Sequence, residues 1–162
     1  MSIKFGPAGL GPIADAVKNL EYYNKKGFQA CEIAFTHGAY IKKDDDAKRI
    51  KEAAEKFKIT LSIHAPYFIN LNSQEEKKLE MSKKLIINCC EIGEKLGVYC
   101  VVFHPGYYMG TDIETSFNNI KNTILDLLLT IKKNKWKIKL APETMGKVNV
   151  FGSAEQIAQL TI

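Results

Sequence analysis

Two histidines and one glutamate each stand directly after a short apolar run, at comparable positions in three separate parts of the chain. They are His64, His104 and Glu143. Imidazole nitrogens and carboxylate oxygens are typical ligands of hydrolytic zinc, which keeps a further coordination position for water or substrate. Any one of these residues could be an ordinary polar group at the end of a strand. Three in equivalent positions favour a metal site, provided that the fold brings them together.

The apolar runs that precede these residues belong to an alternation of short strands and longer amphipathic helices. Strands are expected at 3–6, 30–36, 60–64, 100–103 and 138–142. The intervening segments carry apolar residues at the three- and four-residue spacing of helices. A βα unit that repeats roughly every 30 to 40 residues predicts parallel strands joined by crossover helices. No Gly-x-Gly-x-x-Gly motif follows the first strand, which argues against a dinucleotide-binding Rossmann fold.

The candidate ligands at the carboxyl ends of strands three, four and five are typical of a (β/α)₈ barrel, whose active sites lie at that end. A complete barrel needs eight strands and about 250 residues, whereas this chain has 162 residues and five expected strands. We therefore predict the α/β class and a partial (β/α)₈ TIM barrel of about five βα units. Residues 1–162 are expected to be a single domain, roughly the first five-eighths of the barrel. The open edges of such a sheet favour self-association.

Three of the helices are expected to begin with a capping box, in which a Ser or Thr precedes a Glu or Gln by three residues. The pairs are Ser73 with Glu76, Thr111 with Glu114, and Ser153 with Gln156. In a capping box each side chain bonds a backbone N–H that the helix leaves unpaired. The boxes therefore place the starts of the third, fourth and fifth helices.

Side chains alternate between the two faces of a strand, so the direction of the candidate ligands fixes that of their neighbours. If those ligands point into the barrel, bulky apolar residues on every strand face the helices, and Lys4, Glu32 and Lys139 face inward. Enclosed charges must be paired or solvated. We therefore expect Glu32 to contact at least one of the two lysines. His37 lies beyond the last inward position of its strand and is expected to be an exposed loop residue.

The composition is that of a soluble globular protein. Hydrophobic residues make up 46% and charged residues 25% of the chain, a balance that argues against a disordered protein. No run approaches the roughly 18 apolar residues of a membrane span, and the N-terminus lacks the apolar core of a signal peptide. The four cysteines show no Cys-x-x-Cys spacing, so we expect small hydrophobes in a reducing compartment. These features predict a cytoplasmic protein.

Aromatic and basic residues are expected around the rim that carries the candidate ligands. Tyr67, Tyr107 and Tyr108 follow two of the strands, and Lys42 and Lys43 lie in the loop after the second strand. Basic groups bind a phosphate backbone and aromatic rings stack with bases, so this rim suits a nucleic acid strand. The net charge of +5 mildly favours the same kind of partner. Tyrosines and lysines are common on protein surfaces, so the rim alone does not identify the partner.

Three segments together resemble endonuclease IV, the apurinic/apyrimidinic DNA endonuclease of the xylose isomerase-like barrel superfamily. They are His64-Ala65-Pro66-Tyr67 followed by Ile69-Asn70-Leu71, then Val102-Phe103-His104-Pro105-Gly106, then Glu143-Thr144-Met145-Gly146-Lys147 with Phe151-Gly152-Ser153. The resemblance covers essentially the whole chain, in order. It implies a hydrolase of base excision repair that cleaves a DNA phosphodiester on the 5′ side of an abasic site. DNA containing abasic sites is then the partner, and up to three zinc ions are the cofactors.

The resemblance also implies roles for the candidate ligands. His64 and His104 match the two histidines that hold one zinc ion. Glu143 matches the carboxylate that bridges this ion to a second one, which makes Glu143 the catalytic residue of this chain. Ligands for one zinc site are therefore present. Family ligands on strands six to eight, which bind the second and third ions, have no counterpart here.

The family pattern further suggests which residues contact DNA. Tyr67 matches a tyrosine beside the site, and the loop 36–43 corresponds to a DNA-recognition loop. That loop has no convincing match to the arginine that fills the gap in the duplex, so this role is not carried over. Together with the rim residues above, the expected DNA contacts are Tyr67, Lys42, Lys43 and Tyr107.

Two other functions remain open at the level of sequence. The first is a sugar isomerase or epimerase of the same superfamily, which also uses a divalent metal at the strand ends but encloses a small polyol. The second is a non-catalytic form that binds metal or DNA. Cleavage by several metals needs one ion to generate hydroxide and another to neutralise the leaving oxygen, so the ligands of one ion do not by themselves establish activity.

Overall fold

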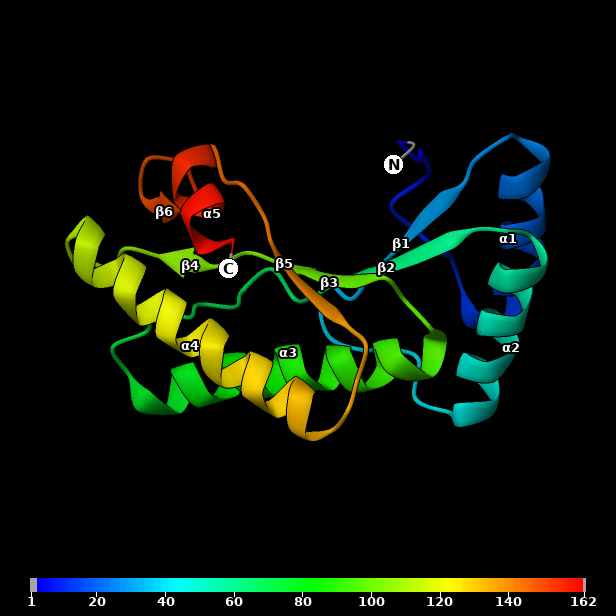
Figure 1. Cartoon of the computed structure of the whole chain (residues 1–162). Coiled ribbons are helices and arrows are strands. Elements are labelled where there is room, and N and C mark those ends of the chain that lie inside the picture. Colours follow the sequence, from blue (N-terminus) through cyan, green and yellow to red (C-terminus); the bar gives the residue numbers. More distant parts are fainter. Residues whose placement is uncertain (1–2, 162) are drawn as a thin grey trace.

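Four short strands form a parallel sheet in the computed structural model, which describes residues 3–161 (Figure 1). The strands are β1 (Ala30–Ala34), β2 (Thr60–His64), β3 (Cys100–Phe103) and β5 (Lys139–Pro142), hydrogen-bonded in the order β1-β2-β3-β5. Neighbouring strands are parallel, and a helix separates each from the next along the chain. The predicted α/β class, with parallel strands and crossover helices, is confirmed.

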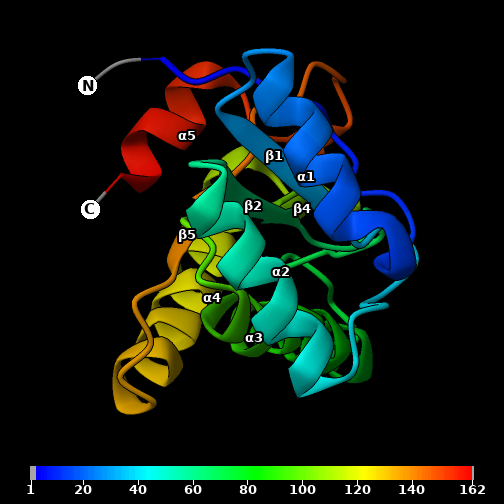
Figure 2. The ribbon, with the colours of Figure 1, turned by 90° about the vertical axis from the view of Figure 1, so that its right-hand side faces the viewer.

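Within residues 3–161, one 3₁₀ helix and five α-helices flank these strands. They are η1 (Ile13–Asp15), α1 (Ala16–Lys25), α2 (Asp44–Lys56), α3 (Glu76–Leu96), α4 (Ile113–Lys133) and α5 (Ala154–Leu160). The helices α1 to α4 pack in chain order, each against the next, and α2 and α3 also contact the sheet (Figure 2). Gly97, with a φ of 67°, ends α3 in the left-handed conformation that glycine adopts without strain.

One face of β1, β2 and β3 is buried beneath the helices, and the other face is half-exposed. The buried residues are Cys31, Ile33, Leu61, Ile63, Val101 and Phe103. They alternate along β1, β2 and β3 with residues of intermediate exposure, as expected for a sheet covered on one face. This alternation confirms that the bulky apolar side chains of these strands face the helices.

The strand predicted at 3–6 is not part of the sheet. The segment instead runs parallel to β1, where Phe5 and Pro7 accept hydrogen bonds through their carbonyl oxygens. Pro7 has no N–H and cannot donate the return bond that a regular ladder requires. Gly6 approaches so closely that a Cβ atom there would lie 1.6 Å from the carbonyl oxygen of Ala30. The prediction of position was therefore right and that of regular structure wrong.

Of the three predicted capping boxes, only the one that begins at Ser153 is present. The helix α3 begins after Glu75 with no side-chain cap, because Ser73 already bonds the backbone of Glu75 in the turn before the helix. The cap of α4 is Asp112, whose carboxylate accepts from the Thr115 N–H at 2.9 Å. An aspartate accepts as well as a threonine at this position, so a shift of one residue costs the helix nothing.

A second, two-stranded sheet lies at the carboxyl ends of the main strands and was not predicted. It pairs β4 (Gly106–Tyr107) antiparallel with β6 (Val150–Phe151). The strand β4 belongs to the loop after β3, and β6 belongs to the loop after β5 (Figure 1). This small sheet therefore ties together two of the loops that follow the candidate ligands.

The main sheet is open at β5. A groove of about 660 Å³ runs along this strand between α4 and α5, lined mainly by apolar residues such as Ile124, Leu128 and Ile157. Residues 3–161 supply no strand that pairs with the outer edge of β5. An open apolar edge supports the expected self-association, which stays a prediction. In the same residues, no helix combines the length and the apolar character needed to cross a membrane.

Candidate metal centre

The three candidate ligands come from adjacent strands and lie at the same end of the sheet. His64 is the last residue of β2, His104 directly follows β3, and Glu143 directly follows β5. Because β2, β3 and β5 are parallel neighbours, their carboxyl ends meet at one edge of the sheet. The fold thus brings together the three residues that the sequence singled out.

The ligand atoms converge on the carboxylate of Glu143. Its Oε2 lies 2.9 Å from His64 Nε2 and 3.1 Å from His104 Nε2. The candidate ligand atoms of the three residues all lie within 4.8 Å of one another, and the two imidazole rings stand nearly perpendicular with centroids 5.1 Å apart. The side chains of His64 and His104 are 16% and 22% exposed, against 42% for Glu143. The cluster is therefore half-buried and open to solvent on the carboxylate side.

The backbone fixes which nitrogen of His64 faces the cluster. Its Nδ1 lies 2.7 Å from the carbonyl oxygen of Ala65. A carbonyl can only accept a hydrogen bond, so Nδ1 carries a proton, and in the neutral ring Nε2 carries the lone pair. This lone pair and the carboxylate of Glu143 then face each other at 2.9 Å. A cation at this position, either a proton or a metal ion, makes such a contact favourable.

The surroundings of His64 favour positive charge. Burial by itself lowers the pKa of the imidazole, but hydrogen bonds to the Glu143 carboxylate and the Ala65 carbonyl, with the charge of Glu32, outweigh burial. The pKa of His64 therefore lies above its usual value. Groups that stabilise an extra proton on this ring also attract a divalent cation to it.

The donor set fits a zinc ion. A tetrahedral zinc ion with bonds of about 2.0 to 2.2 Å has donor atoms about 3.3 to 3.6 Å apart. The two nitrogen-to-oxygen distances of 2.9 and 3.1 Å are shorter than that spacing by a few tenths of an ångström, so the three side chains would move apart only a little to admit the ion. Two imidazoles and one carboxylate also leave room in the coordination shell for water or substrate. The atoms that would hold the ion are Nε2 of His64, Nε2 of His104 and Oε2 of Glu143.

Comparison with known protein families gives a match to the xylose isomerase-like TIM barrel over residues 20–161. The chain belongs to the xylose isomerase-like TIM barrel family. The predicted fold class, a partial barrel of this kind, is thereby confirmed. The half-exposed face of the sheet corresponds to the inside of the barrel, and the candidate metal centre lies at the end where barrel enzymes carry their active sites.

The sequence relatives of this chain are longer proteins, and the chain aligns with only part of each. An uncharacterized protein of Methanocaldococcus jannaschii is 38% identical over 158 residues, which are 96% of this chain and 56% of that protein. A probable endonuclease 4 of Petrotoga mobilis is 26% identical over 121 residues, which are 73% of this chain and 42% of that protein. The chain thus spans about half the length of the curated relatives it matches.

Solved structures of the same fold include proteins of two different kinds. A D-tagatose 3-epimerase-like protein matches with a TM-score of 0.75 and 22% identity over 98% of this chain and 60% of its own. Endonuclease IV from Thermus thermophilus matches with a TM-score of 0.70 and 23% identity over 94% of this chain and 55% of its own. At these identities the likeness shows the fold alone, so it does not decide between the two kinds.

The tyrosines predicted to contact DNA lie in the loops that carry the cluster and are accessible. Tyr67, three residues after His64, is 48% exposed, and its ring packs edge-on against His37 at 5.9 Å. Tyr107, three residues after His104, is 37% exposed. His37 itself is an exposed loop residue, as the sequence predicted. Their contact with DNA stays a prediction.

Lys42 and Lys43 lie elsewhere. They line a groove of about 310 Å³ between the start of α2 and the second half of α3, together with Asn88 and Lys95. In that groove Lys95 pairs with Asp44 at 2.9 Å. None of the three candidate ligands lines this groove. The structure therefore does not bring the two lysines into the cluster, and their role in DNA binding stays a prediction.

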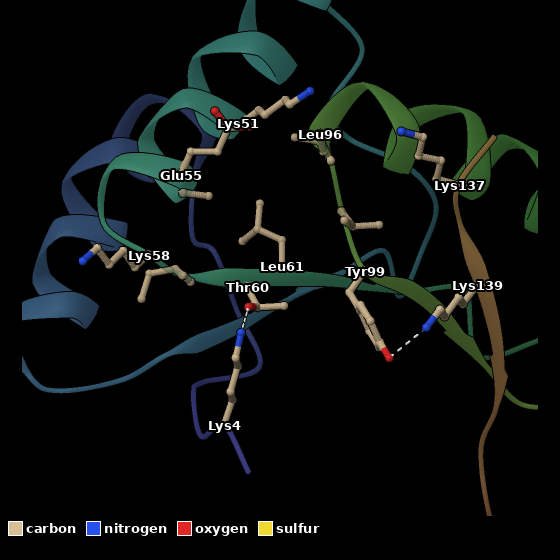
Figure 3. Close-up of a pocket in the computed structure, with 14 residues that line it drawn as sticks. Lys4, Lys51, Glu55, Lys58, Thr60, Leu61, Leu96, Tyr99, Lys137 and Lys139 are labelled. Carbon is tan, nitrogen blue, oxygen red and sulfur yellow. Dashed lines mark hydrogen bonds between the residues drawn. The ribbon is translucent and has the colours of Figure 1, made fainter. Parts of the chain in front are cut away.

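The predicted contact between Glu32 and a lysine is wrong. The ion pairs formed by residues 3–161 do not include Glu32. Instead Lys4 Nζ donates to Thr60 Oγ1 at 2.6 Å, and Lys139 Nζ donates to the Tyr99 hydroxyl at 3.1 Å (Figure 3). Glu32 and Lys139 lie level in the sheet, but two strands separate them. At about 4.8 Å per strand their backbones are about 14 Å apart.

Two asparagines near the centre carry a structural role that sequence reasoning missed. Asn70 and Asn72 belong to the loop after β2, and Asn72 is 1% exposed although its side chain is polar. A buried amide must find hydrogen-bond partners. The sequence offered a signal, because two amides flank the apolar Leu71 directly after the apolar residues 68–69, but it did not show what they bind.

Proposed function

We propose that this chain carries one metal site of a zinc-dependent endonuclease that hydrolyses DNA on the 5′ side of abasic sites, in base excision repair. The observation that carries the proposal is the position of Glu143 Oε2 beside two imidazole nitrogens, at 2.9 and 3.1 Å. In the proposed site His64, His104 and Glu143 hold one zinc ion. Glu143, the most exposed of the three, is the catalytic residue.

The relatives support a DNA substrate over other substrates of the fold. Several sequence relatives are named probable endonuclease 4, and the Petrotoga protein among them covers 73% of this chain. The same three segments that resemble endonuclease IV contain all three ligands of the cluster. Loops at the rim of a barrel determine its chemistry more than the barrel itself does, so a likeness in these segments bears directly on function.

The groups at the rim suit an anionic phosphodiester. A divalent ion at the cluster would supply Lewis acidity toward a phosphoryl oxygen. Glu143 Oε2 lies within 3.1 Å of Nε2 of both His64 and His104, so the three side chains converge on one point. The exposed rings of Tyr67 and Tyr107 offer flat apolar faces for bases beside the lesion. The net charge of +5 attracts the DNA backbone.

The test combines metal analysis with a cleavage assay. The zinc content of the purified chain is compared with that of His104→Ala, and both proteins are incubated with a labelled duplex that contains one abasic site. We expect one zinc ion per wild-type chain, little in the variant, and zinc-dependent incision that leaves a 3′-hydroxyl on the 5′ side of the lesion. Equal zinc in both proteins would refute the ligand assignment. Zinc binding without incision would assign cleavage to a longer barrel or favour a non-catalytic form.

A sugar epimerase is the second candidate, and one observation favours it. The D-tagatose 3-epimerase-like structure aligns with 98% of this chain. An epimerase also needs a divalent metal at the strand ends, but it must enclose a small polyol. Incubation with a panel of ketoses, followed by chromatography of the products, separates the two functions. Epimerised ketose without incision of abasic DNA would replace the endonuclease proposal.

We also infer that the protein works in the cytoplasm. Its four cysteines are free thiols, and three of them are buried. Burial raises the pKa of Cys89 and of Cys90 to about 12, so neither forms a thiolate at neutral pH. Such thiols act as small apolar side chains and suit a reducing compartment. Identical thermal stability with and without a thiol reductant would agree with this inference, whereas a disulfide in the purified native protein would contradict it.

A further inference from the structure

The side chain of Asn72 bridges two loops that carry candidate ligands. Its amide nitrogen donates to the carbonyl oxygens of Tyr107 and Tyr108, at 3.0 and 3.1 Å, and also lies 3.0 Å from Ser116 Oγ. Its amide oxygen accepts from Asn119 Nδ2 at 2.9 Å. Asn72 belongs to the loop after β2, whereas Tyr107 and Tyr108 belong to the loop after β3. A buried amide with all these partners holds the two loops in one arrangement.

The side chain of Asn70 and the backbone of Leu71 add further hydrogen bonds around the same two loops. Asn70 Oδ1 accepts from the Tyr107 N–H at 3.1 Å and from the Asn72 N–H at 3.0 Å. The Leu71 N–H donates to the carbonyl oxygen of Pro105 at 2.9 Å. Pro105 is the residue directly after His104, so the bond from Leu71 holds the peptide between Pro105 and Gly106, one residue beyond the candidate ligand.

Gly106 allows this close approach. Its φ is 145°, and a Cβ atom at this position would lie 2.2 Å from Asn70 Oδ1 and 3.1 Å from the Leu71 nitrogen. Only glycine leaves space for both contacts and adopts this backbone conformation without strain. We call Asn70, Asn72 and Gly106 the loop clasp.

The clasp continues to the loop that carries the third ligand. Gly106 and Tyr107 form β4 and pair with Phe151 and Val150 of β6. Within the loop after β5, the Met145 N–H donates to the Gly152 carbonyl at 2.7 Å and so links the residues next to Glu143 to β6. The loops after β2, β3 and β5 are therefore joined by one continuous set of hydrogen bonds. These are the loops that follow His64, His104 and Glu143.

We propose that Asn72 is a positioning residue of the metal centre, which sets the distance between His64 and His104 by holding residues 105–108 against residues 70–72. The inference rests on the proposed metal site but not on the identity of the substrate. Ligands that are fixed before the ion arrives bind it more tightly, and substitution of groups that orient ligands typically lowers metal affinity by about 10- to 100-fold.

The test compares Asn72→Ala with Ser82→Ala as a matched control. Ser82 is also a buried polar residue, 6% exposed, and its hydroxyl accepts from the Asn70 N–H at 3.1 Å. Ser82 therefore supports the same loop, from α3, without bridging to residues 105–108. A role in stability alone predicts similar behaviour of the two variants, whereas a positioning role predicts that they differ.

Two measurements at a temperature well below unfolding distinguish these roles. Zinc affinity is measured by competition with a chelator, and proximity of the two imidazoles is measured in the metal-free protein by nuclear Overhauser contacts between ring protons. We expect Asn72→Ala to lose about 10- to 100-fold in zinc affinity and to lose the contacts between His64 and His104. We expect Ser82→Ala to retain both within about twofold. Equal affinities and equal contacts in the two variants would overturn the proposal.

The metal-free measurement separates this proposal from the proposed function. If the wild-type chain binds zinc but cleaves no abasic DNA, the endonuclease proposal fails and the affinities still decide the role of Asn72. If the wild-type chain binds no zinc, the contacts between the imidazoles decide it. Should Asn72→Ala not fold, Asn70→Ala removes the acceptor of the Tyr107 N–H from a half-buried position and must show the same difference from Ser82→Ala.

Discussion

The two ends of the same four strands carry different chemistry. At the carboxyl ends, donor atoms of three residues lie within 4.8 Å of one another. At the amino ends, a cavity of about 520 Å³ is lined by many cations (Figure 3). Its charged residues are Lys4, Lys51, Lys58, Lys137, Lys139 and Glu55. The cavity lined by many lysines is thus at the opposite end of the strands from the candidate metal ligands.

The lysines at the amino ends are held apart. Lys4 bonds Thr60, the first residue of β2, whereas Lys139 bonds Tyr99, which directly precedes β3, and Lys58 extends away from the centre of the cavity (Figure 3). The last turns of α2 and α3 also line this cavity, and cations near the carboxyl end of a helix stabilise its dipole. The comparison teaches that donors at fixed mutual distances identify a candidate site better than the size or charge of a hollow does.

The largest expected effect follows from removal of one ligand at the carboxyl end. His104→Ala leaves two donors, and we expect zinc affinity to fall by at least about 100-fold. Substitution of residues that only hydrogen-bond to metal ligands already lowers metal affinity by about 10- to 100-fold. Isothermal titration with zinc measures this change. Lys139→Met, at the other end of the sheet, is the matched control and should bind zinc as the wild type does. Similar losses in both variants would abolish the distinction between the two ends.

A second effect tests how rigidly the carboxyl-end loops are packed. Gly106→Ala places a methyl group against Asn70 and imposes a φ of 145° on alanine. We expect the free energy of unfolding to fall by at least about 2 kcal/mol, measured by urea denaturation. Gly110→Ala has a φ of 80° but nothing within 4 Å of the new Cβ, so it should cost only the backbone strain of about 1 to 2 kcal/mol. Equal losses of unfolding free energy in the two variants would mean that the contact with Asn70 does not contribute to the destabilisation.

Much of the carboxyl-end site could be predicted from the sequence because it depends on periodicity. The alternation along β2 and β3 fixes which side chains face the barrel, and parallel strands bring equivalent ends together. His64, His104 and Glu143 were therefore predicted as a group, and the structure places them together. The aromatic rim at Tyr67 followed from the same reasoning, because it lies three residues beyond a strand end.

Contacts between loops could not be predicted in the same way. The bridge from Asn72 to residues 105–108 and the pairing of β4 with β6 join segments whose loop geometry has no period. Lys42 and Lys43 were expected at the rim, but the loop turns them toward α3. Glu32 was expected to meet a lysine on the basis of facing direction alone, although facing direction does not give the distance across the sheet. The face of a strand to which a side chain points is encoded in the local sequence, whereas the distance between side chains on different strands depends on the assembled fold.

The pH dependence of stability offers a smaller effect that is specific to the carboxyl end. The folded-state pKa of His64 lies above its usual value, which is about 6.5 for an unfolded chain. The resulting stabilisation of the metal-free protein is complete below about pH 6.5 and is lost as the pH rises through the folded-state pKa. We expect Glu143→Gln to reduce this dependence, because it removes the carboxylate that holds the proton.

Urea denaturation between pH 6 and 8, in the presence of a chelator, measures this dependence. With zinc present the sign reverses, since protons compete with the ion for His64 and the affinity falls as the pH falls. Lys139→Met provides the comparison, because it leaves the cluster unchanged and should keep the pH profile of the wild type. A profile for Glu143→Gln identical to that of the wild type would mean that His64 does not share its proton with Glu143.

The smallest expected effect lies at the amino end. Lys139 Nζ lies 4.5 Å from the centroid of the Tyr99 ring and bonds its hydroxyl, and a cation over an exposed ring is worth about 0.5 to 1 kcal/mol. Lys139→Met keeps the apolar stem, so we expect the free energy of unfolding to fall by about 0.5 kcal/mol with zinc affinity unchanged. Lys58→Met, whose cation extends into solvent, should change neither quantity. If Lys139→Met lowered zinc affinity, the charge at the amino end would act on the site across the barrel, and the two ends could no longer be treated as independent.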